Sequence, residues 1–285
     1  MAIMATGCTK ESQKSSIRLL TEPMNFGGAK VLVDPTNINT IRNAEWVLGE
    51  QILLNGSAYP ITERSSGTYY IELAEPINTA LLGIYPTTLN SNGNDVTYNA
   101  NTLTINSLNI DFRGSSHRII FPMAAEAAAG SSSLKFDHLT GGLKLTLTDT
   151  STARNYTLGS LRIVTYGNNA TAATIAARHG ITACWAKQGL TVPGGMVGQN
   201  GNSVDAKYAS QMDFTLTTNG TTPGKAIPDG GSISICVPVT ISSVKKLEVT
   251  GFGTDGTQLF SRMKEFGEAK TLEANHMYSI PEIQF

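Results

Sequence analysis

The chain has 285 residues, and 40% of them are hydrophobic, which suffices for a sizeable core spread over two domains of ordinary size. Charged residues make up only 15%, against about 25% in typical soluble domains, so uncharged polar residues must supply much of the surface. The formal net charge is -1, with 21 basic and 22 acidic residues and no block of like charge, which argues against a surface for nucleic acid or anionic membranes.

Alternation of apolar and polar residues with a period of two dominates the chain and predicts β-strands with one buried face. The strands expected in chain order are AKVLV (29–33), TYYIEL (68–73), HRIIF (117–121), LKLTLT (143–148), SLRIV (160–164), DFTLT (213–217), SISICVPVTI (232–241) and KLEVT (246–250). Turn clusters such as LNGSAYP, LNSNGND and PDGG separate them. Residues 171–180 predict one short helix, and no run of about 18 apolar residues predicts a membrane span. The fold class expected is all-β, built as β-sandwiches with few short helices.

Two changes of phase interrupt this alternation. Leu103 and Ile105 lie on one parity, but the next apolar residues are Leu108, Ile110 and Phe112. Near the C-terminus Tyr278 and Ile280 share a parity, whereas Ile283 and Phe285 have the opposite one. A shift of one residue would turn every later side chain to the wrong face, so each place requires a bulge or a turn.

The segment GFGTDG (251–256) matches the dinucleotide-binding fingerprint G-x-G-x-x-G. That fingerprint functions only where it opens a helix within a βαβ unit, and TQLFSRMKEF after it is no clear amphipathic helix. A turn that joins two antiparallel strands explains the glycines better.

The four histidines have no metal-ligand spacing, and the sequence contains no G-x-S-x-G elbow, no H-E-x-x-H and no Walker loop, so we expect no enzyme, no cofactor and no metal. Three cysteines are present. Cys8 precedes a polar run, while Cys184 and Cys236 are either two free thiols or a disulfide pair.

Several pieces in a fixed order resemble one family, the fimbrillin-like surface proteins, which are type V pilus subunits and their lipoprotein relatives. They are WVLGEQILLNGSAYPI (46–61), LLGIYP (81–86), FPMAAEA (121–127), LKFDHLTGGLKLTL (134–147), SLRIVT (160–165), GFGTDGTQ (251–258) and LEANHMYSI (272–280). The resemblance covers about residues 25 to 285. It implies two transthyretin-like β-sandwich domains in series, no cofactor, and assembly or adhesion at the cell surface. Together with a boundary near residue 175, in a stretch rich in Gly, Ala and Asn, it divides the chain into a tether (1–24), an N-terminal domain (25–175) and a C-terminal domain (176–285).

The resemblance also implies roles for particular residues. Ala5-Thr6-Gly7-Cys8 resembles a lipobox in which Ala5 replaces the usual Leu, so Cys8 is the expected lipid-bearing residue, and a signal peptide would have to precede it. Proteolytic processing in the family follows an arginine near the N-terminus and releases the first strand. The Arg18–Leu19 bond is the candidate here, with Arg42 and Arg64 as rivals.

The terminal segment MYSIPEIQF supplies the candidate donor strand, with Tyr278, Ile280, Ile283 and Phe285 as its apolar residues. The alternative is that this segment pairs within its own domain, in which case the subunit would cap or anchor a pilus.

The function expected is that of a structural or adhesive surface protein, a fimbrillin-like pilus subunit or anchor that assembles by strand exchange. Its partners would be other pilus subunits, with a host or glycan ligand as a further candidate, and it would contact the outer membrane only through the lipid. The alternative is a monomeric surface lipoprotein that binds a glycan or a host molecule, which an exposed aromatic cluster would favour.

Overall fold

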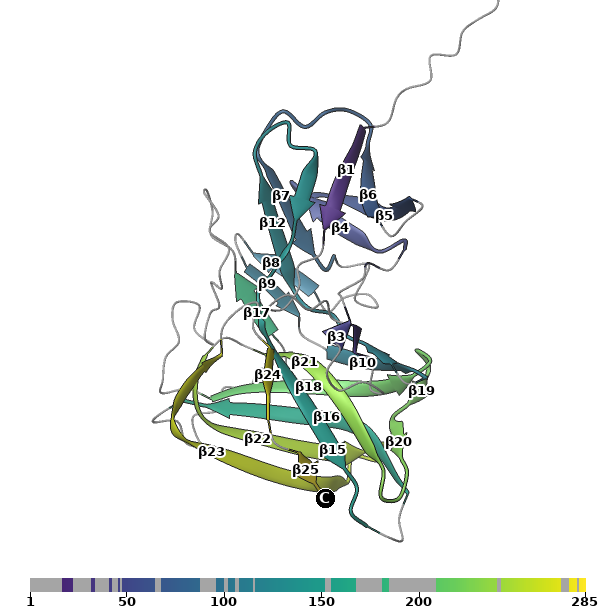
Figure 1. Ribbon diagram of the computed structural model, residues 1–285, viewed down its shortest axis with the longest axis vertical. Helices are drawn as coiled ribbons and strands as arrows, with labels where there is room; N and C mark the ends of the chain where they lie inside the picture. The colour runs from purple at the N-terminus through teal and green to yellow at the C-terminus, as the bar shows by residue number, and fades with distance from the viewer. Residues whose placement is uncertain are drawn as a thin grey trace, which may run out of the picture.

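A computed structural model of the chain describes residues 17–22, 32–33, 41–42, 46, 48–64, 68–87, 96–99, 102–105, 108–114, 116–151, 155–167, 181–184, 209–239, 242–272, 277–280 and 282–285. All elements in these ranges are β-strands, which confirms the all-β prediction (Figure 1). The ranges contain no helix long and apolar enough to cross a membrane. The helix predicted over 171–180 lies outside the described residues.

The N-terminal part of the chain forms one sheet of eight strands that nearly closes on itself. Its order is β13 (Ser133–Lys135), β1 (Ile17–Glu22), β6 (Thr68–Leu73), β5 (Ser57–Arg64), β4 (Gln51–Leu54), β7 (Leu81–Tyr85), β12 (Met123–Ala127) and β14 (Asp137–His138). The two ends of this order, β13 and β14, are separated by Phe136 alone. We call this nearly closed sheet the ring. Closure matters because an unpaired sheet edge invites pairing with other chains.

The ring encloses an aromatic core. Trp46 packs edge-on against Tyr85 and Phe136, with ring centroids 5.1 and 5.2 Å apart. Alternating residues of the strands fill the rest; on β4, for example, Ile52 and Leu54 are buried, whereas Gln51 and Leu53 are half-buried. The buried members are Trp46, Ile52, Leu54, Ile61, Ile71, Leu73, Leu81, Tyr85, Met123, Ala125, Leu134 and Phe136.

The C-terminal part is a two-layer sandwich, the lower body in Figure 1. The larger layer has the order β11 (Ser116–Arg118), β10 (Leu108–Arg113), β18 (Ala209–Thr218), β16 (Tyr156–Tyr166), β22 (Ser242–Gly253) and β23 (Gln258–Leu272), with β19 (Thr222–Pro223) on β18 and β20 (Lys225–Ile227) on β16. The smaller layer has the order β21 (Ser232–Val239), β15 (Gly141–Thr148) and β24 (Met277–Ser279), with β25 (Ile283–Gln284) also on β15.

The alternation read from the sequence determines the register of the smaller layer. Leu143, Leu145 and Leu147 of β15 lie opposite Val237, Ile235 and Ile233 of β21, and all six are buried. These residues share one core cluster with inward-facing residues of the larger layer such as Leu161, Ile163, Phe214 and Val249. Burial of such side chains is the main source of the sandwich's stability.

Both changes of phase coincide with changes of pairing. Before the first, β9 (Thr102–Ile105) pairs with β8 (Val96–Asn99) and β17 (Ile181–Cys184) in a small separate sheet, and after it β10 joins the large layer. At the second, the register on β15 gains one residue, since Ser279 lies opposite Lys144 but Ile283 lies opposite Leu147. The extra residue between Ser279 and Ile283 returns the apolar side chains to the buried face.

The ring and the sandwich share apolar contacts. Ile84, Ala124 and Leu139 belong to the core cluster of the sandwich, although β7 and β12 are ring strands. A further pair, β2 (Leu32–Val33) and β3 (Ile41–Arg42), contacts β11 and β21 of the sandwich through β2. Two strands that precede residue 175, β15 and β16, pair with β21 and β22, which follow residue 176. The domain boundary near residue 175 and the transthyretin-like topology stay predictions.

Candidate functional site

The C-terminal segment, predicted as a donor strand, pairs in this structure with β15 of its own sandwich. β24 and β25 both run parallel to β15, with Tyr278 opposite Leu143 and Ile283 opposite Leu147. Ile283 is buried, whereas Tyr278 and Ile280 are half-buried and pack against the sandwich core. Since β24 and β25 both pair with the same edge of β15, departure of this segment would leave that edge unpaired.

Phe285 anchors the end of this segment. Its ring stacks on Phe260 of β23, with centroids 4.4 Å apart, and contacts Tyr156 edge-on at 5.8 Å. The Phe285 carbonyl accepts bonds from the Thr150 amide at 2.7 Å and the Thr150 hydroxyl at 2.9 Å. These contacts fit the alternative of pairing within the domain, and donation to another subunit stays a prediction.

Arg18, the predicted processing residue, lies inside a strand. It is part of β1, where its backbone is opposite Glu72 of β6. β1 is antiparallel to β6 and parallel to β13, so it fills the position between these two strands of the ring. Arg42 ends β3 and Arg64 ends β5. The predicted lipid-bearing residue, Cys8, lies outside the described residues.

Cys236 is a free thiol that is fully buried in β21, so it forms no disulfide with Cys184 of β17. Burial raises the pKa of the Cys236 thiol to about 12, and Lys144 opposes this rise only in part. A thiol of this kind is unreactive, because the thiolate is the nucleophilic form.

The GFGTDG segment forms the hairpin between β22 and β23, as predicted. The Gly253 amide donates to the Thr257 carbonyl at 2.8 Å, and the carboxylate of Asp255 accepts from the amide and hydroxyl of Thr257 at 3.0 and 2.6 Å. These two hydrogen bonds lower the pKa of Asp255. Gly256 has a φ of 83°, which favours glycine. The motif therefore does not open the helix that a pyrophosphate site requires.

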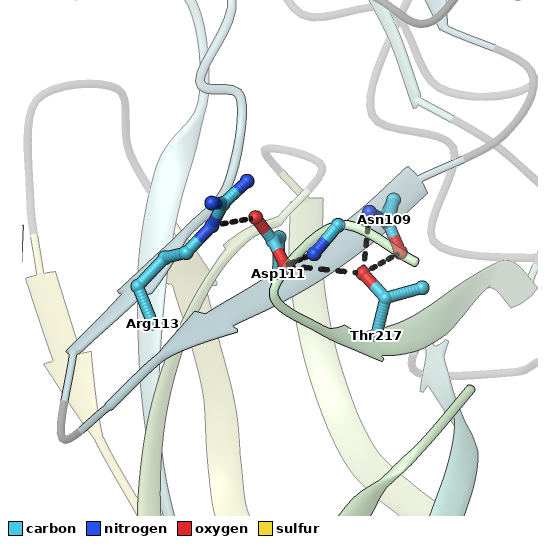
Figure 2. Close-up of polar contacts among 5 residues, drawn as sticks. Asn109, Asp111, Arg113 and Thr217 are labelled. Atoms are coloured by element: carbon cyan, nitrogen blue, oxygen red, sulfur yellow. Dashed lines mark hydrogen bonds and ion pairs between the residues drawn. The ribbon is translucent and has the colours of Figure 1, made fainter. Parts of the chain in front are cut away.

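A polar cluster on β10 and β18 escaped the sequence analysis (Figure 2). The carboxylate of Asp111 accepts bonds from Arg113 Nε at 2.5 Å and from the Gly220 amide at 2.6 Å. Asn109 Nδ2 donates to Thr217 Oγ1 at 3.1 Å on the adjacent strand. These contacts bind both Asp111 oxygens and tie β10 to the turn after β18, so the cluster has a structural role. The sequence LNIDFR (108–113) does contain a sign of this cluster. Its apolar residues at even positions are buried, and the polar residues Asn109, Asp111 and Arg113 alternate with them.

A second polar network crosses β16, β22 and β23. Tyr166 donates to Glu248 at 2.7 Å, Ser261 donates to the other Glu248 oxygen at 3.0 Å, and Thr250 donates to Ser261 at 3.1 Å. Burial, followed by the bond to Glu248, raises the pKa of Tyr166 to about 12. Both Glu248 oxygens thus accept a hydrogen bond, and the network ties β16, β22 and β23 together.

His117 joins the two layers of the sandwich at their other flank. It lies on β11, is 4% exposed, and its Nε2 accepts the backbone N–H of Cys236 on β21 at 3.1 Å. Burial lowers the pKa of His117 to about 4, against a smaller upward contribution from the Cys236 contact. The histidine is therefore neutral at physiological pH and acts as a hydrogen-bond acceptor between sheets. Within the described ranges, no group of three His, Cys, Asp or Glu residues could hold a metal ion.

No protein-family model matches the sequence, and neither does any curated protein. Among solved structures, the chain is similar to a "putative cell adhesion protein" of Bacteroides ovatus, with 12% identity and a TM-score of 0.44 over 95% of this chain and 93% of that one. A protein of the same description from Bacteroides uniformis shows 14% identity and a TM-score of 0.41 over 96% and 93%. A fimbrial protein of Bacteroides ovatus shows 8% identity and a TM-score of 0.29 over 94% of this chain and 50% of that one.

Proposed function

We propose that the chain is a structural or adhesive protein of the cell surface, of the fimbrillin type, which joins other subunits by exchanging a β-strand. The observation that carries this proposal is the position of β1. One short strand from the N-terminus fills the gap between β6 and β13 in a sheet that is otherwise closed.

Loss of β1 would open a groove of defined chemistry. The backbone groups of β6 and β13 that face β1 would lose their partners along the registered stretch from Ile17 to Glu22. Buried backbone groups without partners are costly, so a replacement strand is favoured. The strands beside the groove carry Ile71 and Leu134, both fully buried members of the ring core. Apolar side chains of an incoming strand would cover this core again.

The place of the cut decides whether the groove opens. A cut after Arg18 leaves Leu19–Glu22 attached to the chain and paired in the ring. A cut after Arg64 also removes Trp46, Ile52 and Leu54 from the core, which the ring would not survive. A cut after Arg42 releases the whole of β1 together with β2 and β3 and spares the core strands. Arg18 remains the residue predicted from the sequence, and Arg42 is the rival that best fits complete release of β1.

The donor strand in this proposal is the segment of β24 and β25. Tyr278 and Ile280 are half-exposed and can change partners at small cost, but Ile283 and Phe285 must leave the sandwich core. Donation is therefore favoured only when another subunit offers an open groove. A subunit that keeps this segment docked would instead cap or anchor a pilus. The Cys8 lipid would hold such a subunit at the outer membrane through the tether that follows it.

Limited trypsin digestion followed by size-exclusion chromatography tests the proposal. Wild-type protein should form ladders of oligomers after the cut, whereas Arg42→Gln should stay monomeric and Arg18→Gln should still polymerise. A ladder lost in Arg18→Gln and kept in Arg42→Gln would place the cut at the sequence-predicted bond.

The donor segment is tested with a matched pair of variants. Ile280→Asp places a charge on a half-buried apolar position and should abolish the ladder, while Ser279→Asp at the exposed neighbour should not. Circular dichroism melts confirm that both variants are folded. Cut protein that remains monomeric at high concentration would refute strand exchange.

A further inference from the structure

An open groove lies on one flank of the sandwich, between the last strand of each layer. The larger layer ends at β23 and the smaller one at β24 and β25. The groove has a volume of about 290 Å³, and its lining includes Leu247, Val249, Arg262, Lys264, Ile280 and Ile283. We call it the flank groove. It is separate from the ring and from the position of β1.

We propose that the flank groove binds a small amphiphilic carboxylate, a molecule with a short alkyl body and an acidic head. Its alkyl body would lie on the apolar floor and its head between the two cations of β23. The inference does not depend on strand exchange.

The floor of the groove belongs to the sandwich core. Leu247 and Val249 are buried residues of β22 that face the smaller layer, and Ile283 of β25 is buried on the opposite side. Ile280 is half-buried, packs against the same core and continues this surface outward. An alkyl chain placed here would contact both layers and would gain affinity by removing its methylene groups from water.

The rim carries a net positive charge, because Arg262 and Lys264 outnumber the one carboxylate, Glu282. Arg262 donates from Nε to the Gln284 carbonyl and from Nη1 to the Ser261 carbonyl, each at 3.0 Å, so its bonds go to neutral acceptors. The side-chain ammonium of Lys264 has no hydrogen-bond or ion-pair partner among the described residues. The one carboxylate of the rim, Glu282, accepts a hydrogen bond from the Thr148 hydroxyl and pairs with neither cation. An anionic head is thus complementary to the rim, and a cationic head is not.

The Arg262 bond also argues against a peptide strand as the occupant. The Gln284 carbonyl points away from β15 toward β23, and Arg262 already occupies it. A strand added to the free side of β25 would need this acceptor for its ladder. At about 290 Å³ the groove is near the lower end of the range for ligand pockets, which suits a small molecule.

The test is a titration of the full chain with octanoate, followed by methyl NMR. We expect shifts confined to Leu247, Val249, Ile280 and Ile283, and affinity that falls as ionic strength rises. Octanol and octylammonium are the charge controls and should bind at least about fivefold more weakly, the size expected for one or two exposed ion pairs. No saturable shift with octanoate, or equal binding of octanol, would overturn the proposal.

Two lysine variants provide the matched control. Lys264→Gln should weaken octanoate binding about fivefold, whereas Lys246→Gln should leave it unchanged, because Lys246 pairs with Glu265 and does not line the groove. The titration is made on the monomer, because donation of the β24 and β25 segment would take Ile280, Glu282 and Ile283 out of the groove. Failure of polymerisation would leave the octanoate result unaffected, so the two proposals fail separately.

Discussion

Acid should weaken the sandwich through His117, whose imidazole must be neutral to accept the Cys236 amide. The pKa of His117 is lowered by burial from 6.5 to about 4 in the folded chain. Between these two values the unfolded chain binds a proton that the folded chain does not. The free energy of unfolding is therefore highest above pH 6.5, falls as the pH drops from 6.5 to 4, and loses nothing further from this group below 4.

The size of the effect follows from the difference in pKa. One pKa unit corresponds to about 1.4 kcal/mol, so this single group should account for a loss of about 3 kcal/mol across that window. A typical domain is stable by about 5–15 kcal/mol, so such a loss is large enough to measure. The imidazole is 4% exposed and solvent therefore screens the effect little.

Urea unfolding followed by circular dichroism between pH 4 and 7 provides the measurement. His117→Gln keeps a hydrogen-bond acceptor but has no group that titrates in this range. Between pH 7 and pH 4 the variant should therefore lose about 3 kcal/mol less of its free energy of unfolding than the wild type does. His117→Leu should be less stable at pH 7 by about 1–3 kcal/mol, because the Cys236 amide loses its partner in the core. Equal pH dependence in wild type and His117→Gln would refute this reasoning, as would an NMR titration that places the His117 pKa near 6.5.

Three further predictions concern buried or turn residues. Gly251→Ala should lower stability by about 1–3 kcal/mol, because its Cβ would clash with Phe260 and lie 2.9 Å from Leu158 Cδ1, while Gly267→Ala, with open space around its Cβ, should change thermal unfolding little. Cys236 should react with a thiol reagent only at the rate of unfolding, and rapid labelling of native protein that is lost in Cys236→Ser would contradict its burial. Titration with NAD or FAD should give neither heat nor a melting shift, and a micromolar affinity abolished by Gly253→Val would show that the GFGTDG turn binds a dinucleotide.

The sequence predicted the elements whose signal is local. LKLTLT and SISICV alternate strictly, and they form adjacent strands whose leucines and isoleucines face the core. GFGTDG was identified as a hairpin because no helix follows it, and the structure places it between β22 and β23. The phase change near the C-terminus predicted an irregularity, which appears as one extra residue in the register on β15. In each case the information lies within about ten residues of sequence.

Features that depend on long-range pairing were not accessible in this way. The two ends of the ring meet because β13 pairs with β1 and the adjacent β14 pairs with β12. β13 has three residues and β14 has two, which is too short for either to show a periodic pattern. His117 was an unremarkable residue of HRIIF until the fold brought it to Cys236, 119 positions away. Lys264 and Arg262 gain significance only because the C-terminal segment lies opposite them.

The processing bond shows how one such pairing changes a functional argument. From the sequence, the polar run before Arg18 suggested an accessible bond whose cleavage would release the first strand. In the fold, IRLLTE is itself that strand, and its partners are residues 68–73 and 133–135, which no local pattern relates to it. A protease that must release an entire strand has to cut beyond its last paired residue, Glu22. The argument therefore moves from the polarity of the flanking residues to the order of strands in the ring, and the arginine variants measure which of the two criteria the protease follows.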